Sequence, residues 1–152
     1  MALKSSGRST ACCVAFLTLF ASSCGAKPET GPGIIDPDAP QEFTETASGL
    51  KYRILRKSDG ARPEPADRVR VDYSGWLDSG VVFDTTYDGQ EPRSFQLQQV
   101  IQGWTEGLQL IGEGGMIELE VPPELGYGAE GNPTIPPNAT LHFKIELLEI
   151  ES

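Results

Sequence analysis

The sequence predicts an α+β domain in which an antiparallel β-sheet curves around one short α-helix. Several segments alternate apolar and polar residues, and only one segment places apolar residues at helical spacing. Gly (17 residues) and Pro (12 residues) are abundant among the 152 residues, which favours turns over long helices. Because the sheet and the helix each have an apolar face to cover, the simplest arrangement packs one against the other.

The chain divides into a targeting segment, a linker and one folded domain. Residues 1–23 contain Lys4 and Arg8, then an apolar run that ends in small residues before Cys24. This layout is typical of a secretory signal, and the run is shorter than the roughly 20 residues that span a bilayer. Residues 24–41 are rich in Pro, Gly and Asp, and we interpret them as a flexible linker. Residues 42–152 form the predicted domain.

The end of the targeting segment resembles the lipobox of bacterial lipoproteins. Small residues precede Cys24, although Ala21 stands where that family usually has Leu. The resemblance implies that Cys24 becomes the mature N-terminus, carries lipid, and holds the protein in the cell envelope facing the periplasm. The alternative is a plain secretory signal cut near Ser23, which would give a secreted or periplasmic protein.

Alternation predicts six strands, at residues 50–55, 69–77, 81–83, 94–97, 117–121 and 141–147. In the first strand, Leu50, Tyr52 and Ile54 share one face. The Pro-containing segment that follows it cannot be a central strand, because proline donates no backbone hydrogen bond. A turn at Asp78–Ser79–Gly80 joins the second strand to the third as a hairpin. The last strand has the most regular alternation.

Residues 99–111 form the one predicted helix. Their apolar side chains recur at helical spacing: Val100, Ile101, Trp104, Leu108 and Ile111. Gly103 and Gly107 should each weaken this helix by about 1 kcal/mol relative to Ala. A glycine-rich stretch ends it, and a long Gly- and Pro-rich loop at 124–138 precedes the last strand.

Composition excludes several classes of function. The formal net charge of −10 argues against binding to a nucleic-acid backbone, which requires clustered Lys and Arg. All three Cys precede residue 25, and His142 is the only His, so the sequence predicts neither a metal site nor a Cys–His nucleophile in the domain. Residues 126–131 spell G-x-G-x-x-G, but Asn132–Pro133 follows where a dinucleotide site needs a helix. We therefore expect no cofactor.

Aromatic residues come from five separate predicted elements: Tyr73, Phe83, Trp104, Tyr127 and Phe143. Each of them alone could be an ordinary core residue. However, Phe83 lies at the end of a strand, and Tyr127 lies in a Gly- and Pro-rich loop, where functional residues concentrate. Together these residues could line a concave, mostly apolar pocket with polar atoms at its edge.

Five blocks of sequence, in order, resemble the FKBP-type peptidyl-prolyl cis-trans isomerases: VDYSGWL (71–77), VFDTT (82–86), QVIQGWTEG (99–107), PPELGYG (122–128) and IPPNATL (135–141). The resemblance implies a five- to six-stranded half-barrel around a short helix. It also implies catalysis of rotation about X-Pro bonds in polypeptides without a cofactor, and it raises the prospect of macrolide binding. The domain has no heptad repeat or large apolar face, so we expect a monomer.

The resemblance also implies a role for individual residues. Trp104 would form the floor of the pocket, and the walls would be Tyr73, Phe83 and Phe143. Two polar groups would meet the carbonyl groups of the bound peptide, those of Asp84 and Tyr127. The remaining implied residues surround the entrance: Val100, Ile101 with its backbone amide, Gln99 with its backbone carbonyl, and Ile135 in a mobile flap.

Two positions depart from the family pattern. Arg93 stands where the family usually has Phe, and Gly89 stands where an Arg that pairs with the site aspartate is often found. We hypothesise that Arg93 reaches across to Asp84 in place of the missing Arg. A cation at this rim would narrow the pocket or favour an acidic residue near the proline. The alternative function is a proline-peptide binding module or chaperone, in which the altered rim has weakened or abolished turnover.

Overall fold

The structure, a computed structural model, describes residues 33–151. The predicted signal segment, Cys24 and the first part of the predicted linker lie outside the described residues. The described elements, in chain order, are β1 (Thr44–Glu45), β2 (Lys51–Arg56), β3 (Arg68–Leu77), β4 (Val82–Thr85), β5 (Arg93–Gln96), a 3₁₀ turn (Leu97–Gln99), α1 (Gln102–Leu108), β6 (Met116–Val121), a second 3₁₀ turn (Pro123–Leu125) and β7 (Leu141–Glu151).

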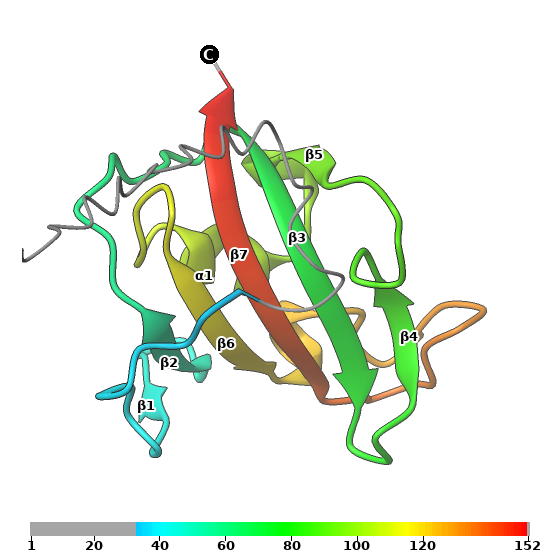
Figure 1. Cartoon of the computed structure of the whole chain (residues 1–152). Helices are drawn as coiled ribbons and strands as arrows, with labels where there is room; N and C mark the ends of the chain where they lie inside the picture. The colour runs from blue at the N-terminus through cyan, green and yellow to red at the C-terminus, as the bar shows by residue number, and fades with distance from the viewer. Residues whose placement is uncertain (1–32, 152) are drawn as a thin grey trace, which may run out of the picture.

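The strands form one antiparallel sheet in the order β1-β2-β6-β7-β3-β4, and β5 also pairs with β3. Figure 1 shows β3 and β7 crossing the middle of the curved sheet, with α1 behind it. The six predicted strands and the single α-helix are confirmed for the described residues. The sheet has seven strands rather than five to six, because β1 adds a pair of residues too short to show alternation.

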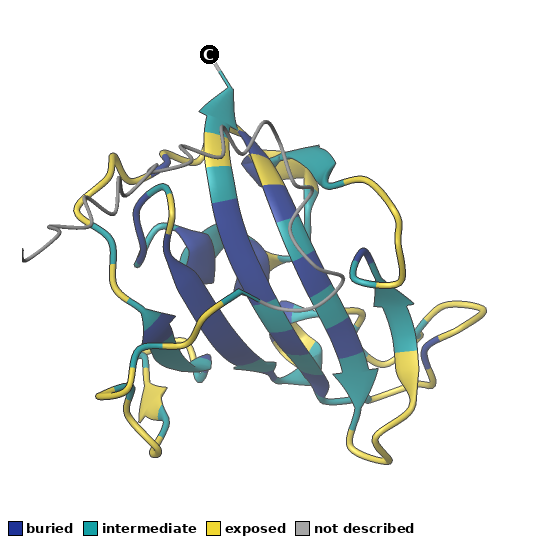
Figure 2. Cartoon of the chain, in the orientation of Figure 1, coloured by how far each residue is buried: buried dark blue, intermediate teal, exposed yellow. Residues whose placement is uncertain are grey.

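The two faces of the sheet differ sharply in polarity. Inward-facing residues of β3, such as Val69, Val71 and Tyr73, alternate with more exposed neighbours, which gives the banded strands of Figure 2. On the outer face, ion pairs join neighbouring strands: Lys51 Nζ lies 2.8 Å from Glu120 Oε1, and Arg53 Nη2 lies 2.7 Å from Glu118 Oε2. The apolar face of the sheet is therefore the concave one, which packs against α1.

The helix is shorter than the predicted 99–111. Val100 and Ile101 have extended backbone, with ψ of 174° and 148°, and α1 begins only at Gln102. Both side chains pack against the core from this extended segment. The apolar residues at helical spacing thus belong to consecutive structures: Val100 and Ile101 to an extended segment after a 3₁₀ turn, Trp104 and Leu108 to a two-turn helix, and Ile111 to the loop that follows it. Spacing alone could not separate them.

Residues 33–41, the described part of the predicted linker, hydrogen-bond to the folded domain. The Asp36 N–H donates to the Leu55 carbonyl oxygen at 2.8 Å, and Arg53 Nη1 donates to the Gln41 carbonyl oxygen at 2.9 Å. Among residues 33–151, no helix is both long enough and apolar enough to cross a bilayer.

Candidate active site

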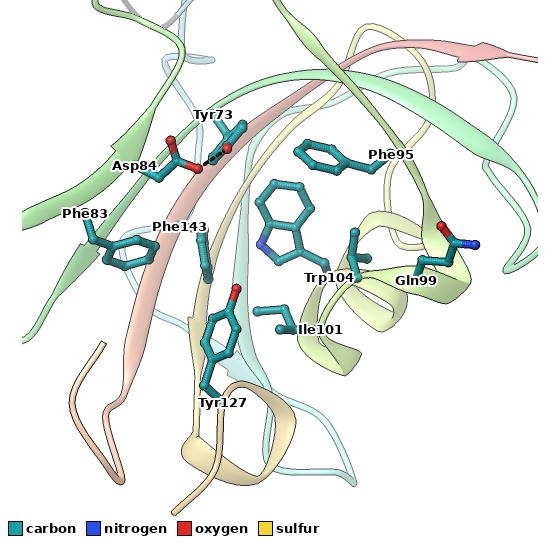
Figure 3. A pocket seen from close by; sticks show the side chains of 10 residues that line it. Tyr73, Phe83, Asp84, Phe95, Gln99, Ile101, Trp104, Tyr127 and Phe143 are labelled. Carbon is teal, nitrogen blue, oxygen red and sulfur yellow. Dashed lines mark hydrogen bonds between the residues drawn. The ribbon is translucent and has the colours of Figure 1, made fainter. Parts of the chain in front are cut away.

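A cavity of about 310 Å³ opens on the concave side of the sheet. Its volume lies at the lower end of the range of small-molecule sites. The lining is mostly aromatic and aliphatic (Figure 3), and it consists of Tyr73, Phe83, Asp84, Phe95, Gln99, Val100, Ile101, Trp104, Tyr127 and Phe143.

Trp104 of α1 forms the floor of the cavity and is 4% exposed. Three rings stand nearly perpendicular to its indole at centroid distances of 5.0–5.5 Å: those of Tyr73 at 83°, Phe143 at 85° and Phe95 at 87°. Edge-to-face contacts of this kind are the favoured geometry for aromatic pairs. The rings therefore hold one another in fixed positions around the cavity.

The indole nitrogen of Trp104 is buried without a hydrogen-bond partner among the described residues. Figure 3 shows this nitrogen directed towards the side of the cavity where Phe143 and the Tyr127 hydroxyl lie. Buried donors are almost always paired in folded proteins, and an unpaired one at the floor of a cavity points to a bound group that would accept its hydrogen bond.

The polar rim is built around Asp84. The Tyr73 hydroxyl donates to Asp84 Oδ2, and Arg93 Nη1 lies 3.2 Å from the same oxygen and 3.1 Å from the Tyr73 hydroxyl. The predicted contact between Arg93 and Asp84 is thus confirmed. The side chains of Arg93 and Asp84 are 40% and 37% exposed, so their ion pair contributes little to folding and mainly fixes geometry.

Thr86, just after β4, ties the strand that carries Asp84 to β3. Its N–H donates to the Tyr73 carbonyl at 2.9 Å, and its hydroxyl accepts the Tyr73 N–H at 3.0 Å and donates to Asp72 at 2.8 Å. Thr86 is only 2% exposed, so these bonds are shielded from water. The carboxylate of Asp84 is consequently held beside the aromatic floor.

Burial raises the pKa of the Tyr73 hydroxyl, and the adjacent Asp84 carboxylate raises it further. The folded protein therefore keeps Tyr73 protonated at pH values where a tyrosine in an unfolded chain, with a pKa near 10, releases its proton.

We expect the free energy of unfolding to decrease above about pH 10, and to decrease less steeply in Tyr73→Phe. The protonated Tyr73 hydroxyl contributes its full stabilisation below the pKa of tyrosine in the unfolded chain. This contribution is lost as pH rises towards the higher pKa of Tyr73 in the folded protein, by up to about 1.4 kcal/mol per pH unit. Urea unfolding of both proteins between pH 8 and pH 11 measures the two slopes. Equal slopes would mean that Tyr73 is not the group held protonated.

The structure brings together nine of the residues implied by the sequence: the four aromatic floor and wall residues, Asp84, Gln99, Val100, Ile101 and Tyr127. Ile135 is buried (3% exposed) within its loop and is not among the lining residues, and Arg93 reaches the rim only through Asp84 and Tyr73.

Sequence reasoning missed Phe95, which lies in β5 opposite Val69 of β3 and packs its ring edge against Tyr73 and Trp104. Its aromatic side chain in a short predicted strand was the available signal. The side of the sheet that it faces is set by the pairing of β5 with β3, which the sequence does not reveal.

Within residues 33–151, no group of three His, Cys, Asp or Glu side chains is placed to hold a metal ion. The site instead combines a rigid aromatic cavity, an unpaired indole N–H at its floor, and a carboxylate and a phenol at its rim. Such a site can desolvate an apolar ring and bind its peptide groups, but it offers no nucleophile paired with a base.

An antiparallel sheet that curves over one short helix, with an aromatic cavity on its concave side, defines the class of this chain as an FKBP-like fold. The family model for FKBP-type peptidyl-prolyl cis-trans isomerase matches residues 60–148. The chain belongs to the FKBP-type peptidyl-prolyl cis-trans isomerase family.

Two curated relatives illustrate the similarity. The FKBP-type peptidyl-prolyl cis-trans isomerase FkpA of Escherichia coli (strain K12) is 48% identical over 106 residues, which is 70% of this chain and 39% of the relative. The Outer membrane protein MIP of Legionella longbeachae is 47% identical over 106 residues, covering 68% of this chain and 45% of the relative. The chain thus spans less than half the length of these two relatives.

Solved structures agree with the fold. The crystal structure of FkpA from Escherichia coli has a TM-score of 0.71 and 46% identity, covering 74% of this chain and 53% of that one. The crystal structure of AtFKBP13 has a TM-score of 0.67 and 31% identity, covering 72% of this chain and 99% of that one.

Proposed function

We propose that this protein is a peptidyl-prolyl cis-trans isomerase that accelerates rotation about X-Pro bonds in polypeptides. The observation that carries the proposal is the aromatic cavity over the buried Trp104, with the Asp84 carboxylate and the Tyr127 hydroxyl at its edge. Family membership supports the same activity. Uncatalysed X-Pro rotation takes tens to hundreds of seconds and can limit folding, so a catalyst has a clear use.

The chemistry follows from amide resonance. Rotation breaks the partial double bond of the peptide, which sets an uncatalysed barrier of about 18–20 kcal/mol. A planar amide separates more charge than a twisted one, so a cavity that strips water from the carbonyl disfavours the planar ground state relative to the twisted state. Lowering the barrier by about 5 kcal/mol corresponds to an acceleration of roughly 4,000-fold.

We assign roles to the lining residues on this basis. The proline ring lies on Trp104, between walls formed by Tyr73, Phe83, Phe95 and Phe143. The Ile101 amide and the Tyr127 hydroxyl donate to carbonyl groups of the substrate. Asp84 orients the peptide at the rim, Val100 and Gln99 line the entrance, and Ile135 supports the 131–138 loop from within.

Arg93 is proposed to position Asp84 in place of the Arg that Gly89 replaces. Its three polar contacts support this role, because Nη2 also donates to Gln90 Oε1 at 2.7 Å, which holds the guanidinium at the rim. Part of its positive charge stays accessible to solvent, and it would favour substrates with an acidic residue beside proline.

Turnover of short Xaa-Pro peptides by the chain from Cys24 onward tests the function. We expect acceleration by the wild type and a lower kcat/KM for Tyr127→Phe, whose side chain is 42% exposed and so contributes little to folding. For Arg93→Leu we expect a lower kcat/KM, with the largest loss on peptides that have Glu before proline. Unchanged selectivity in Arg93→Leu would refute the proposed role of the guanidinium.

The alternative is a proline-peptide binding module or chaperone. The cation at the rim is the observation that favours it, because Arg93 occupies a position that is apolar in the family pattern. If a folded wild-type protein accelerates no Xaa-Pro peptide yet binds the same peptides, this alternative holds. Binding that weakens in Tyr127→Phe would then locate the peptide in the same cavity.

We further propose that the protein works in the cell envelope as a monomer, on folding polypeptides, with a lipid on Cys24. The signal-like residues 1–23 support this location, and the printed name of the Legionella relative, an outer membrane protein, is consistent with it. Macrolides that bind the family would occupy the same cavity. Cys24→Ser is expected to release the protein from membranes into the soluble envelope fraction, and retention of the variant would argue against lipid attachment.

A further inference from the structure

Residues 33–39, which we term the N-terminal strap, are bound to the outer face of the sheet by backbone hydrogen bonds. The Asp36 N–H donates to the Leu55 carbonyl at 2.8 Å, and the Lys57 N–H donates to Asp36 Oδ2 at 2.7 Å. The side chain of Ile34 is 85% exposed and that of Ile35 is 41% exposed. The strap is therefore held through its backbone and through the carboxylates of Asp36 and Asp38, rather than through apolar side chains.

The strap begins at a clamp formed by Glu146 of β7, Arg56 of β2 and Tyr87. Glu146 is only 7% exposed, and its Oε1 accepts the Gly33 N–H at 2.5 Å and the Tyr87 hydroxyl at 3.1 Å. Arg56 Nη2 lies 2.9 Å from Glu146 Oε2, while its Nη1 donates to the Ile34 carbonyl at 3.2 Å. One partly buried ion pair thus binds both a donor and an acceptor of the strap backbone.

Position 33 has room only for glycine. A Cβ on Gly33 would lie 2.5 Å from Arg56 Nη1 and 2.7 Å from Glu146 Oε2. Both atoms end flexible side chains, but they are tied to each other, and Arg56 Nε is also tied to the Gly114 carbonyl at 2.7 Å. Making room for a methyl group would therefore open the clamp itself.

The strap and the cavity lie on opposite faces of the sheet. In Figure 1 the blue segment that begins at residue 33 crosses the near face, while α1, which carries Trp104, lies behind. The chain therefore enters the folded domain on the face turned away from the cavity.

We propose that the Glu146–Arg56–Tyr87 clamp is a binding site for the N-terminal strap that sets the orientation of the cavity. The clamp makes the chain enter the domain from the outer face. With the lipid proposed at Cys24, this directs the cavity away from the bilayer and towards polypeptides in the surrounding compartment. That consequence rests on the proposed location, whereas the clamp itself does not.

Amide hydrogen exchange, measured by NMR on the chain from Cys24 onward, tests the clamp, and this chain keeps every described residue. We expect the Gly33 and Asp36 amides to be protected in the wild type. Because hydrogen bonds to charged groups are among the stronger ones, Gly33→Ala and Glu146→Gln should each speed exchange at both amides by at least about tenfold. Equal rates in the wild type and in Gly33→Ala would overturn the proposal.

Two matched control variants distinguish loss of the clamp from a general loss of stability in the domain. Gly31→Ala makes the same change two residues earlier, and Glu120→Gln removes a carboxylate that pairs with Lys51 on the same face without contacting the strap. Both should leave exchange at Asp36 unchanged, and faster exchange in either would overturn the proposal. Isomerase activity of Gly33→Ala should stay within about twofold of the wild type, so failure of the clamp and failure of the proposed activity give different results.

A nitroxide label on Cys24, the only cysteine after residue 13, tests the orientation. Gly33 lies nine positions further along the chain, so the label stays within about 30 Å of the clamp. It should broaden amide signals around Arg56 and Tyr87 more strongly than those around Trp104 and Tyr127, and Gly33→Ala should reduce this difference. Equal broadening on both faces in the wild type would refute the orientation.

Discussion

Replacing Trp104 with alanine is expected to abolish isomerase activity and to lower the free energy of unfolding by about 3–5 kcal/mol. The indole is almost completely buried and contacts three other rings edge-on, so its removal leaves a large void at the centre of the cavity. The floor on which the proline ring would rest disappears with it. Peptide turnover and urea unfolding measure the two effects separately.

The second tryptophan of the chain provides the matched control. Trp76 stacks on His142 at a centroid distance of 5.9 Å, on the outer face of the sheet and away from the cavity. Trp76→Ala should therefore destabilise the protein while leaving kcat/KM unchanged. If Trp104→Ala were too unstable to assay, Trp104→Phe would keep an apolar floor but remove the indole N–H, and it should still lower kcat/KM. Wild-type kcat/KM in a folded Trp104→Ala protein would exclude this cavity as the catalytic site.

Gly103→Ala is expected to lower the free energy of unfolding by about 1–3 kcal/mol, although alanine favours helix formation by up to about 1 kcal/mol. A Cβ at this position would lie 2.7 and 2.8 Å from the two Cγ atoms of Val121, which is completely buried in β6. Valine has one strongly restricted side-chain torsion, so it cannot move aside and the helix must shift. Because Trp104 is the next residue, kcat/KM should fall as well.

Gly107→Ala is the comparison for this prediction. Its Cβ would meet the terminal Cδ atoms of Leu119 at 2.7 and 2.8 Å, and a leucine side chain can rotate to make room. We therefore expect Gly107→Ala to be clearly less destabilising than Gly103→Ala, as urea unfolding of both variants would measure. Equal or greater stability of Gly103→Ala relative to the wild type would show that α1 does not pack on β6 as closely as described.

The effect of these two glycines cannot be predicted from the residues around them in the sequence. By helix propensity alone, both weaken the segment that carries them. In the folded protein, they allow α1 to approach β6 closely enough to place Trp104 under the cavity. The benefit of each missing side chain depends on a residue of the partner strand, Val121 for Gly103 and Leu119 for Gly107, 18 and 12 positions further along the chain. No local sequence pattern shows such a contact.

Six of the seven described strands, the presence of one helix and most of the lining residues follow from the sequence. A strand with one buried face must alternate apolar and polar residues, so β3 and β7 can be predicted from their own sequences. The family motifs implied the aromatic floor and walls together with Asp84 and Tyr127. Strand alternation and family motifs both involve residues that are close together in the sequence, so the sequence alone shows them.

Contacts between distant segments were decided by the tertiary structure. The side of the sheet that Phe95 faces depends on the pairing of β5 with β3, and the start of α1 depends on Val100 and Ile101 packing from extended backbone. The bond from Gly33 to Glu146 joins residues 113 positions apart. Sequence alone determined which residues could be buried or could react, whereas the folded chain decided which of them meet, because register and close approach are properties of pairs of segments.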